Sequence, residues 1–296
     1  MDIDYKIIQD PTYGYKRLDP IPSGDKLDQF YESQYYDLIR RGGRAPDIRR
    51  LMAGGKKAQR EREWTTATTY TDIAYCLKQY APGKRILDVG CGTGEFVTFL
   101  NKSGLRAEGI EPAAEAVEMA QSSGLEVSQT TLETYAQRCS SAFDAITFLD
   151  VLEHIPDPAK IIQEAKGLLS TGGCLCVRSP NDFNDLQIAA RRKLEEEPWW
   201  IAIPDHINYF DFSSLEFLLN ELGFEVVYTQ GDFPMALFLL MGEEYIGNPE
   251  IGKACHWKRV DFETSISATL RRRIYQALAE VEVGRHILMV AKKVTD

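Results

Sequence analysis

Three glycines at alternate positions, Gly90, Gly92 and Gly94, directly follow an apolar segment that begins at Ile86. This pattern is typical of a strand that ends in a tight turn and leads into a helix, here expected from Glu95 to about residue 102. Glycine adopts positive φ easily and lacks a Cβ, so a ligand can lie against the backbone of the turn. The first N–H groups of a helix have no partner within it and carry partial positive charge. The turn therefore predicts a site for a carboxylate or for ribose hydroxyls.

An acidic residue, Glu111, ends the next expected strand, seventeen residues after Gly94. A carboxylate at the tip of that strand can accept hydrogen bonds from both hydroxyls of a ribose, and its charge strengthens those bonds. Glu95 occupies the place of the third glycine in the general dinucleotide pattern. Its carboxylate would repel a pyrophosphate, which counts against a nicotinamide cofactor.

The elements that must position these residues follow from Arg85 onward, where short apolar segments alternate with helical ones. Such alternation predicts an α/β fold with a doubly wound, mostly parallel sheet that is buried on both faces. The carboxyl ends of parallel strands meet at one edge, so the glycine turn and Glu111 should share one crevice with the residues after the fourth strand. The seven expected strands are 85–90, 105–110, 125–129, 143–149, 174–178, 224–230 and 286–292.

Capping residues mark two helix starts within this alternation. Asp157 precedes Pro158, which gives an N-cap followed by proline at the first helical position. Ser213 and Glu216 have the spacing of a capping box. A further helix is expected over residues 61–80, before the first strand.

The residues outside the alternating core are interpreted as a cover. Residues 1–62 are expected to form an N-terminal arm with a helical cover, and residues 63–296 the main domain. Within the latter, an insertion at about 231–284 precedes the last strand and holds a helix with apolar residues at four-residue spacing. A connection of that length in a compact domain usually carries function or a partner surface. The apolar residues of the helix are Ile266, Leu270, Ile274 and Leu278.

The N-terminal arm is divided by composition. Residues 1–24 are rich in Tyr, Pro and Asp and are expected to be extended, and residues 25–41 are expected to be helical. The stretch 40–63 holds nine basic and three acidic residues. It is either a solvated arm or a contact for a phosphate-bearing substrate or an anionic surface.

The composition of the whole chain excludes some partners. A net charge of −10 over 296 residues argues against nucleic acid, which needs a basic face. The six cysteines form no Cys-x-x-Cys pair, a pattern of reduced thiols. The N-terminus has no apolar core of a signal peptide, and the longest apolar run, 233–241, is too short to span a bilayer. A cytoplasmic protein without a transmembrane segment is expected.

Five segments of the chain belong to one pattern: Asp88-x-Gly90-x-Gly92-x-Gly94, Glu111, Phe143-Asp144, Leu152-Glu153-His154-Ile155 and Pro204-Asp205-His206-x-Asn208-Tyr209-Phe210. Together they resemble the class I S-adenosylmethionine-dependent methyltransferases, closest to the ubiquinone-biosynthesis and sugar-modifying type, over about residues 63–293. The resemblance implies a Rossmann-like seven-stranded sheet whose last strand is antiparallel and lies beside the fifth. It also implies S-adenosylmethionine as the cofactor.

The resemblance carries roles to residues of this chain. The glycine turn would lie against the methionine part of the cofactor, Asp88 would help to hold its amino end, and Glu111 would bind the ribose. Residues after the third strand would flank the adenine, and the end of the fourth strand would close the other side. The expected cofactor-binding residues are Asp88, Gly90, Cys91, Gly92, Gly94, Glu111, Pro112, Thr131, Leu132, Glu133, Leu149 and Asp150.

Two of the four histidines are candidate catalytic bases, because a hydroxyl that accepts a methyl group needs a base or a metal to activate it. His154 follows the fourth strand, and His206 lies in a loop beside Asp205. For each, a purely structural role is an equal alternative. Asp150, Glu153 and His154 offer a compact set of oxygen and nitrogen ligands, but residues close in sequence need not converge, so no metal site is assigned.

The function expected from these features is methyl transfer to a hydroxyl of a small molecule or saccharide, which includes saccharides linked to a nucleotide or lipid. A non-catalytic scaffold that binds the cofactor, and a methyltransferase acting on nitrogen or carbon, are the alternatives. A segment like Asn-Pro-Pro-Tyr does not follow the fourth strand, which disfavours protein or nucleic-acid methylation. The sequence leaves the acceptor and the oligomeric state open.

Overall fold

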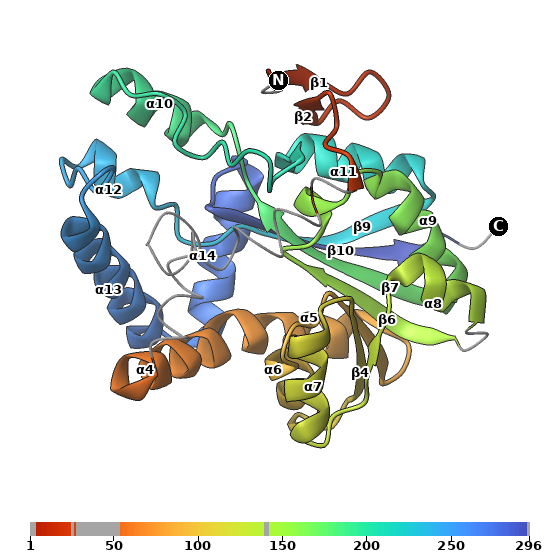
Figure 1. Cartoon of the computed structure of the whole chain (residues 1–296). Coiled ribbons are helices and arrows are strands. Elements are labelled where there is room, and N and C mark those ends of the chain that lie inside the picture. The colour runs from red at the N-terminus through yellow and green to blue at the C-terminus, as the bar shows by residue number, and fades with distance from the viewer. Residues whose placement is uncertain (1–3, 25–26, 28–53, 139–141, 295–296) are drawn as a thin grey trace.

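The computed structural model describes residues 4–24, 27, 54–138 and 142–294 of the chain. The predicted helix over 25–41 and most of the basic stretch lie outside the described residues. A seven-stranded sheet with helices on both faces forms the centre of the described chain, and a separate three-stranded sheet includes the first described strands (Figure 1).

All seven predicted strands form, in the order β5-β4-β3-β6-β7-β10-β9. The pairs among β3 to β7 are parallel, whereas β10 is antiparallel to both β7 and β9. This confirms the doubly wound, mostly parallel sheet with its last strand beside the fifth. The bounds are β3 Arg85–Val89, β4 Arg106–Glu111, β5 Val127–Gln129, β6 Phe143–Leu149, β7 Leu169–Pro180, β9 Phe224–Gln230 and β10 His286–Lys293.

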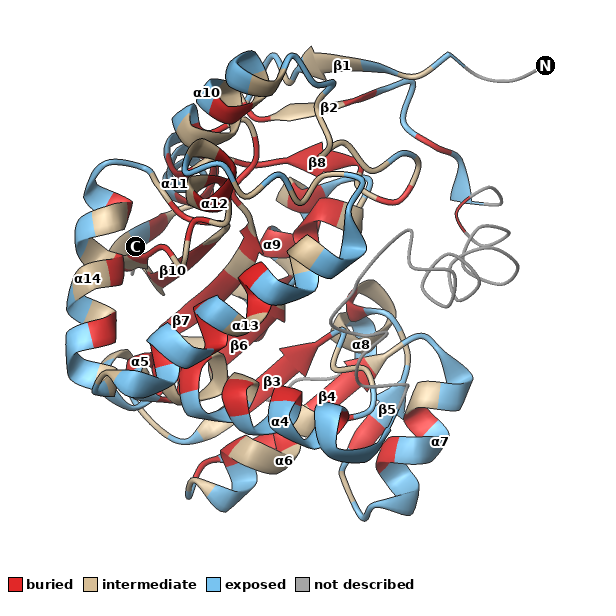
Figure 2. Cartoon of the chain, turned by 90° about the vertical axis from the view of Figure 1, so that its left-hand side faces the viewer, coloured by how far each residue is buried: buried red, intermediate tan, exposed pale blue. Residues whose placement is uncertain are grey.

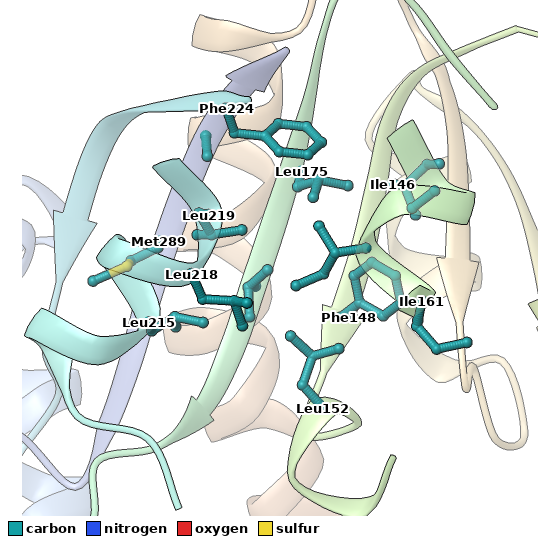
Figure 3. Close-up of a cluster of buried hydrophobic side chains, with 14 of the residues drawn as sticks. Ile146, Phe148, Leu152, Ile161, Leu175, Leu215, Leu218, Leu219, Phe224 and Met289 are labelled. Atoms are coloured by element: carbon teal, nitrogen blue, oxygen red, sulfur yellow. The ribbon is translucent and has the colours of Figure 1, made fainter. Parts of the chain in front are cut away.

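Helices cover both faces of this sheet, so its strands are buried along most of their length (Figure 2). One face packs apolar side chains against α8, α9 and α11, as Figure 3 shows for Leu215, Leu218 and Leu219, which belong to one cluster with Leu175. The other face packs against α5 and α6, with α14 beside α5 and β9. The bounds are α5 Thr71–Tyr80, α6 Glu95–Lys102, α7 Ala114–Ser122, α8 Leu132–Arg138, α9 Pro158–Leu168, α11 Phe212–Glu221 and α14 Ala268–Glu280.

The helix before the first strand of the large sheet starts earlier than predicted and is not uniform. It begins as α4 (Gly55–Thr65), passes through a π-helical turn (Thr66–Tyr70) and continues as α5. Turns of this kind are rare and occur mostly at functional sites. No pattern in the sequence indicated the change of hydrogen-bonding.

The first residues are extended, as predicted, but they pair as a hairpin rather than lying alone. Strands β1 (Lys6–Gln9) and β2 (Lys16–Asp19) pair antiparallel, and β2 also pairs with β8 (Asn208–Tyr209). The ring of Tyr15 lies 5.0 Å from that of Phe210, between centroids. The hairpin is therefore fixed to the loop that carries His206.

The insertion between β9 and β10 forms α12 (Ala236–Leu240), α13 (Pro249–Ser265) and α14. The helix expected around Ile266 begins only at Ala268, and Leu270 is 44% exposed. The residues that α14 buries are Arg271, Tyr275 and Ala279. A polar face points inward because Nη2 of Arg271 donates to two acceptors on the helix before β3, the Ala67 carbonyl at 2.9 Å and the Asp72 carboxylate at 3.0 Å. Helix α12 packs against α10 (Asp185–Leu194).

One of the two predicted helix caps is confirmed and the other is wrong. The Asp157 side chain accepts from the Lys160 N–H, and Pro158 opens α9. Helix α11 is capped by Asp211 instead of Ser213, because the Asp211 carboxylate accepts from the Ser214 N–H at 2.8 Å. The Ser214 hydroxyl accepts in return from the Asp211 N–H at 3.1 Å, so serine takes the place expected of Glu216.

Replacement of Leu218 by alanine should lower the free energy of unfolding by about 2–5 kcal/mol, because it leaves a cavity in a close-packed core. Leu218 is fully buried between α11 and the sheet. Denaturant unfolding measures the change. Phe217→Ala is the control, since Phe217 precedes Leu218 on the same helix and is 47% exposed. Equal effects of the two substitutions would contradict the packing described here.

Candidate functional site

The glycine turn after β3 takes the strained conformation that its residues allow. The φ angles of Gly90, Gly92 and Gly94 are 70°, 53° and 77°, a region that side chains other than glycine rarely adopt. A Cβ on Gly90 would lie 2.8 Å from the Val151 side chain, whereas a Cβ on Gly92 would meet no atom within 4 Å. The turn is therefore packed at its first glycine and open at its middle one, where a ligand can approach the backbone.

The Glu111 side chain connects the tip of β4 to this turn. One carboxylate oxygen accepts from the Gly92 N–H at 3.0 Å, and the other accepts from the Ala113 N–H at 3.0 Å. These bonds fix the orientation of the carboxylate beside the open part of the turn. Each oxygen keeps a second lone pair, so the pair of hydroxyls on a ribose can still be bound.

Asp88 lies deeper than the other acidic residues of the site. It is 3% exposed, and the Thr147 hydroxyl of β6 donates to it at 2.5 Å. Burial raises the pKa of Asp88 to about 7, against the effect of that hydrogen bond, and the charge of Glu111 acts in the same direction as burial. A cationic amino group bound nearby would favour the ionised carboxylate.

The remaining predicted cofactor residues differ in whether their side chains are exposed. The Cys91 side chain packs toward Gly109, and Leu132 is 3% exposed within the core, so neither presents its side chain to the open turn. Pro112 and Thr131 are exposed, and Glu133 and Leu149 are half-buried.

Asp150 directly follows β6 and is held by a residue that the sequence did not single out. It takes a φ of 57° and forms an ion pair with Arg178 of β7. Its N–H donates to the Arg178 carbonyl at 2.9 Å. Arg178 is charged and lies in an otherwise apolar central strand. That contrast was the signal that could have identified it.

Tyr70 is a second residue that sequence reasoning missed. It ends the π-helical turn, and its ring centroid lies 4.9 Å from that of Phe96 in the first turn of α6. Burial raises the pKa of Tyr70, and the carboxylates of Glu95, Asp88 and Asp150 contribute. The tyrosine therefore lies beside the crevice between the glycine turn and the end of β6.

The structure brings the two predicted catalytic histidines together. His154, in a 3₁₀ turn (Leu152–His154), has its ring 5.0 Å from that of His206, with the two rings nearly perpendicular. Nδ1 of His154 lies 2.8 Å from the carbonyl oxygen of Asp205 and 3.2 Å from its carboxylate. Although burial opposes the charged form, Asp205 and Glu153 raise the pKa of His154 to about 9.

The side chains that could hold a metal ion differ from the set considered in the sequence. The ligand atoms of Glu153, His154 and His206 lie within 4.8 Å of one another. Asp150 is outside this group because it pairs with Arg178. Two imidazoles and a carboxylate suit a divalent transition metal. Hydrogen bonds from Ser179 to Glu153 and between His154 and Asp205 are the kind that orient ligands.

A glycine turn after β3, a carboxylate at the tip of β4 and an antiparallel β10 beside β7 are the features that the resemblance to class I S-adenosylmethionine-dependent methyltransferases implies. The comparison with protein families agrees with this class. A family model described as "Methyltransferase domain" matches residues 57–229, and the chain belongs to that family.

Two curated relatives are similar over part of the chain. Both are ubiquinone biosynthesis O-methyltransferases, 40% identical over 103 residues in Actinobacillus pleuropneumoniae serotype 7 and 35% identical over 97 residues in Vibrio cholerae. Each similarity covers 31% of this chain, and 44% and 40% of the respective relatives. The chain therefore spans less than half the length of the relatives it matches.

Two solved structures share the fold over nearly the whole chain. A SAM-dependent methyltransferase from Archaeoglobus fulgidus is 15% identical, with a TM-score of 0.52 over 88% of this chain and 100% of that one. The plantazolicin methyltransferase BpumL, in complex with SAH, is 16% identical, with a TM-score of 0.53 over 91% of this chain and 94% of that one. At such identities the likeness concerns the fold alone.

Replacement of Glu111 by glutamine should raise the dissociation constant of S-adenosylhomocysteine by about 10- to 100-fold, because charge-assisted hydrogen bonds to the ribose and to Gly92 are lost. Isothermal titration calorimetry measures the constant. Glu108→Gln is the matched control, since Glu108 lies on the same strand and pairs with Arg85 instead. A change of less than threefold for Glu111→Gln would show that this carboxylate does not bind the ribose.

Proposed function

We propose that the protein transfers the methyl group of S-adenosylmethionine to a hydroxyl group of a small molecule or saccharide. The observation that carries this proposal is the His154–Asp205 pair, which stands where β6 ends, next to the crevice of the glycine turn. An imidazole held by a carboxylate is the arrangement needed to take a proton from a weakly nucleophilic hydroxyl. The hydroxyl-modifying relatives, matched over part of their length, support the same chemistry.

Methyl transfer from a sulfonium is an in-line displacement, so alignment of the acceptor supplies much of the catalysis. The cofactor supplies an electrophilic methyl group. Glu111 and the open backbone at Gly92 hold its nucleoside and methionine parts. Nδ1 of His154 faces Asp205 and carries a proton, so Nε2 takes the proton of the acceptor hydroxyl as the new C–O bond forms. His206 lies against His154 and is a second candidate for contact with the acceptor.

We assign the cover of the acceptor to residues 1–62 and to the insertion at about 231–284. The end of the first segment, residues 54–62, docks on the second through polar contacts. Glu61 lies 2.9 Å from His256, and Arg60 donates to Asp261 at 2.5 Å. An acceptor that enters between α4 and the sheet would meet both segments.

Localisation in the cytoplasm is part of the proposal, and so is a small-molecule acceptor rather than nucleic acid. Five described cysteines are free thiols, as expected of a reducing compartment. Among the described residues, no helix combines the length and the apolar character needed to cross a bilayer. The net charge of −10 disfavours a polyanionic partner.

The activity should rise with pH through the alkaline range, because only the neutral imidazole of His154 can accept the proton. With a pKa raised to about 9, His154 is mostly protonated at pH 7 and gains its base function as the pH passes 9. Asp205→Asn removes the main cause of that shift. The rising limb of kcat/KM should then move to lower pH by more than one unit, toward the ordinary histidine pKa of about 6.5. Initial rates from pH 6 to 10.5 test this.

His154→Ala should lower kcat by about 10²- to 10⁴-fold, the usual contribution of a general base, and leave the affinity for S-adenosylhomocysteine unchanged. A metal ion bound by Glu153, His154 and His206 would activate the hydroxyl as a Lewis acid, so the activity is also measured with a chelator as a control. Loss of activity with a chelator and its recovery with Zn²⁺ or Mg²⁺ would show that a metal ion, and not a histidine base, activates the hydroxyl. A flat pH profile in a metal-free enzyme would contradict both the base and its pKa.

The acceptor class is tested by incubation of the protein with cofactor labelled in the methyl group and with pools of sugars, phenols and amines. Label transferred to a hydroxyl supports the proposal. Label on nitrogen or carbon would assign a different acceptor atom, and the return of unmodified cofactor from every pool would support a scaffold that only binds it.

A further inference from the structure

A small cavity is lined in part by Arg178, the residue that pairs with Asp150 after β6. Its volume is about 30 Å³, enough for a water-sized group. The π-helical turn, α13 and α14 enclose it against the ends of β7, β9 and β10, as the neighbouring positions of α14, β9 and β10 in Figure 1 indicate. Polar side chains dominate its lining, among them Arg178, Asp232, Arg259, Glu263, Tyr275 and His286.

His286 lines this cavity with one ring nitrogen held by a carboxylate and the other available to a ligand. Its Nδ1 lies 2.7 Å from the Asp232 carboxylate, and its backbone N–H donates to the same carboxylate at 2.8 Å. Because Nδ1 faces a carboxylate, it carries the proton and leaves Nε2 as an acceptor. Among the described residues Nε2 has no hydrogen-bond partner, and 12% of the side chain is exposed.

The surroundings of His286 favour its neutral imidazole. Burial and the positive charges of Arg178 and Arg285 lower its pKa, although Asp232 opposes them. A neutral Nε2 accepts a hydrogen bond and cannot donate one. The complementary group on a ligand is therefore a donor, such as a hydroxyl.

The charges around the cavity are already balanced by one another. Asp232 and Glu263 both accept from Arg259, at 2.9 and 3.2 Å, and Asp72 accepts from Arg271 at 3.0 Å. Arg178 pairs with Asp150 at the end of β6. An anionic ligand would have to displace a buried carboxylate from its arginine, which is costly. An uncharged ligand leaves these pairs intact.

One row of residues across the sheet connects the cavity with the end of β6. Leu149 pairs with Arg178, and Arg178 pairs with Leu288, so these three residues form one row across β6, β7 and β10. His286 lies two residues from Leu288 and so points to the same face as that row. Two strand spacings separate β6 from β10, about 10 Å in total. A molecule methylated at the end of β6 can reach the cavity with a part that is not methylated.

We propose that this cavity is an acceptor subsite, in which a hydroxyl group of an uncharged, hydroxyl-bearing acceptor donates a hydrogen bond to Nε2 of His286. The inference rests on the proposed methyltransferase function and defines the acceptor further. It requires a second hydroxyl at a distance from the methylated one, and it excludes acceptors whose remote end is a carboxylate or phosphate.

The test uses the full chain saturated with S-adenosylhomocysteine and the ¹⁵N resonances of its histidine side chains. Methyl α-glucoside, catechol and glucuronate are the probes, as a neutral saccharide, a neutral phenol and an anionic saccharide. A shift of the His286 Nε2 resonance with methyl α-glucoside or catechol is expected, and which of them causes it separates saccharide from phenolic acceptors. A response to glucuronate alone, or to none of the probes, overturns the proposal.

A substitution gives a second measurement. His286→Asn retains a donor toward Asp232 and removes Nε2, so the dissociation constant of the effective probe should rise about 3- to 10-fold. His256→Asn is the matched control, because His256 is also held by a carboxylate but lies outside the cavity lining. Equal affinities in the wild type and His286→Asn overturn the subsite. Binding of S-adenosylhomocysteine is measured separately by calorimetry. A protein that does not bind it would contradict the proposed function and not only the subsite.

Discussion

A sheet that is buried on both faces leaves its carboxyl-end edge as the place where polar side chains can meet. The strands of this protein are covered by α8, α9 and α11 on one side and by α5 and α6 on the other. Unpaired backbone groups and carboxylates would be costly within those layers unless they were hydrogen-bonded. Asp88, Glu111 and Asp150 accordingly stand at or near strand ends. The cofactor crevice, the histidine pair and the cavity at His286 all follow from this single constraint.

The sequence predicted the elements whose pattern is local. All seven strands of the large sheet formed because apolar runs of that length, separated by helices, have few other ways to be buried. The π-helical turn and the hairpin were missed, since their stability depends on contacts with distant residues such as Asn208. The cap of α11 was misplaced by two residues because Asp211 and Ser213 are both good capping residues, and only tertiary packing selects between them.

The site shows the same division. The glycine turn and Glu111 could be identified from spacing, because a turn, a helix start and a strand tip are local features. Which side chains converge could not be derived in this way. His206 takes the place beside His154 and Glu153 that the sequence offered to Asp150, since Arg178 draws Asp150 toward β7. The polar inner face of α14 could not be predicted from the sequence either. Burial of Arg271 depends on its ion pair with Asp72, which lies on another helix.

The contact between Trp64 and Glu263 has a consequence for the order in which the molecule is built. Its two residues are 199 positions apart, and the Trp64 indole donates to the Glu263 carboxylate at 2.6 Å. Glu111 and Gly92 are only 19 positions apart. During synthesis the proposed nucleoside-binding crevice can therefore be completed on a nascent chain, whereas the proposed enclosure around the acceptor must wait for the last quarter of the polypeptide. A ribosome-bound intermediate would possess the first of these sites without the second.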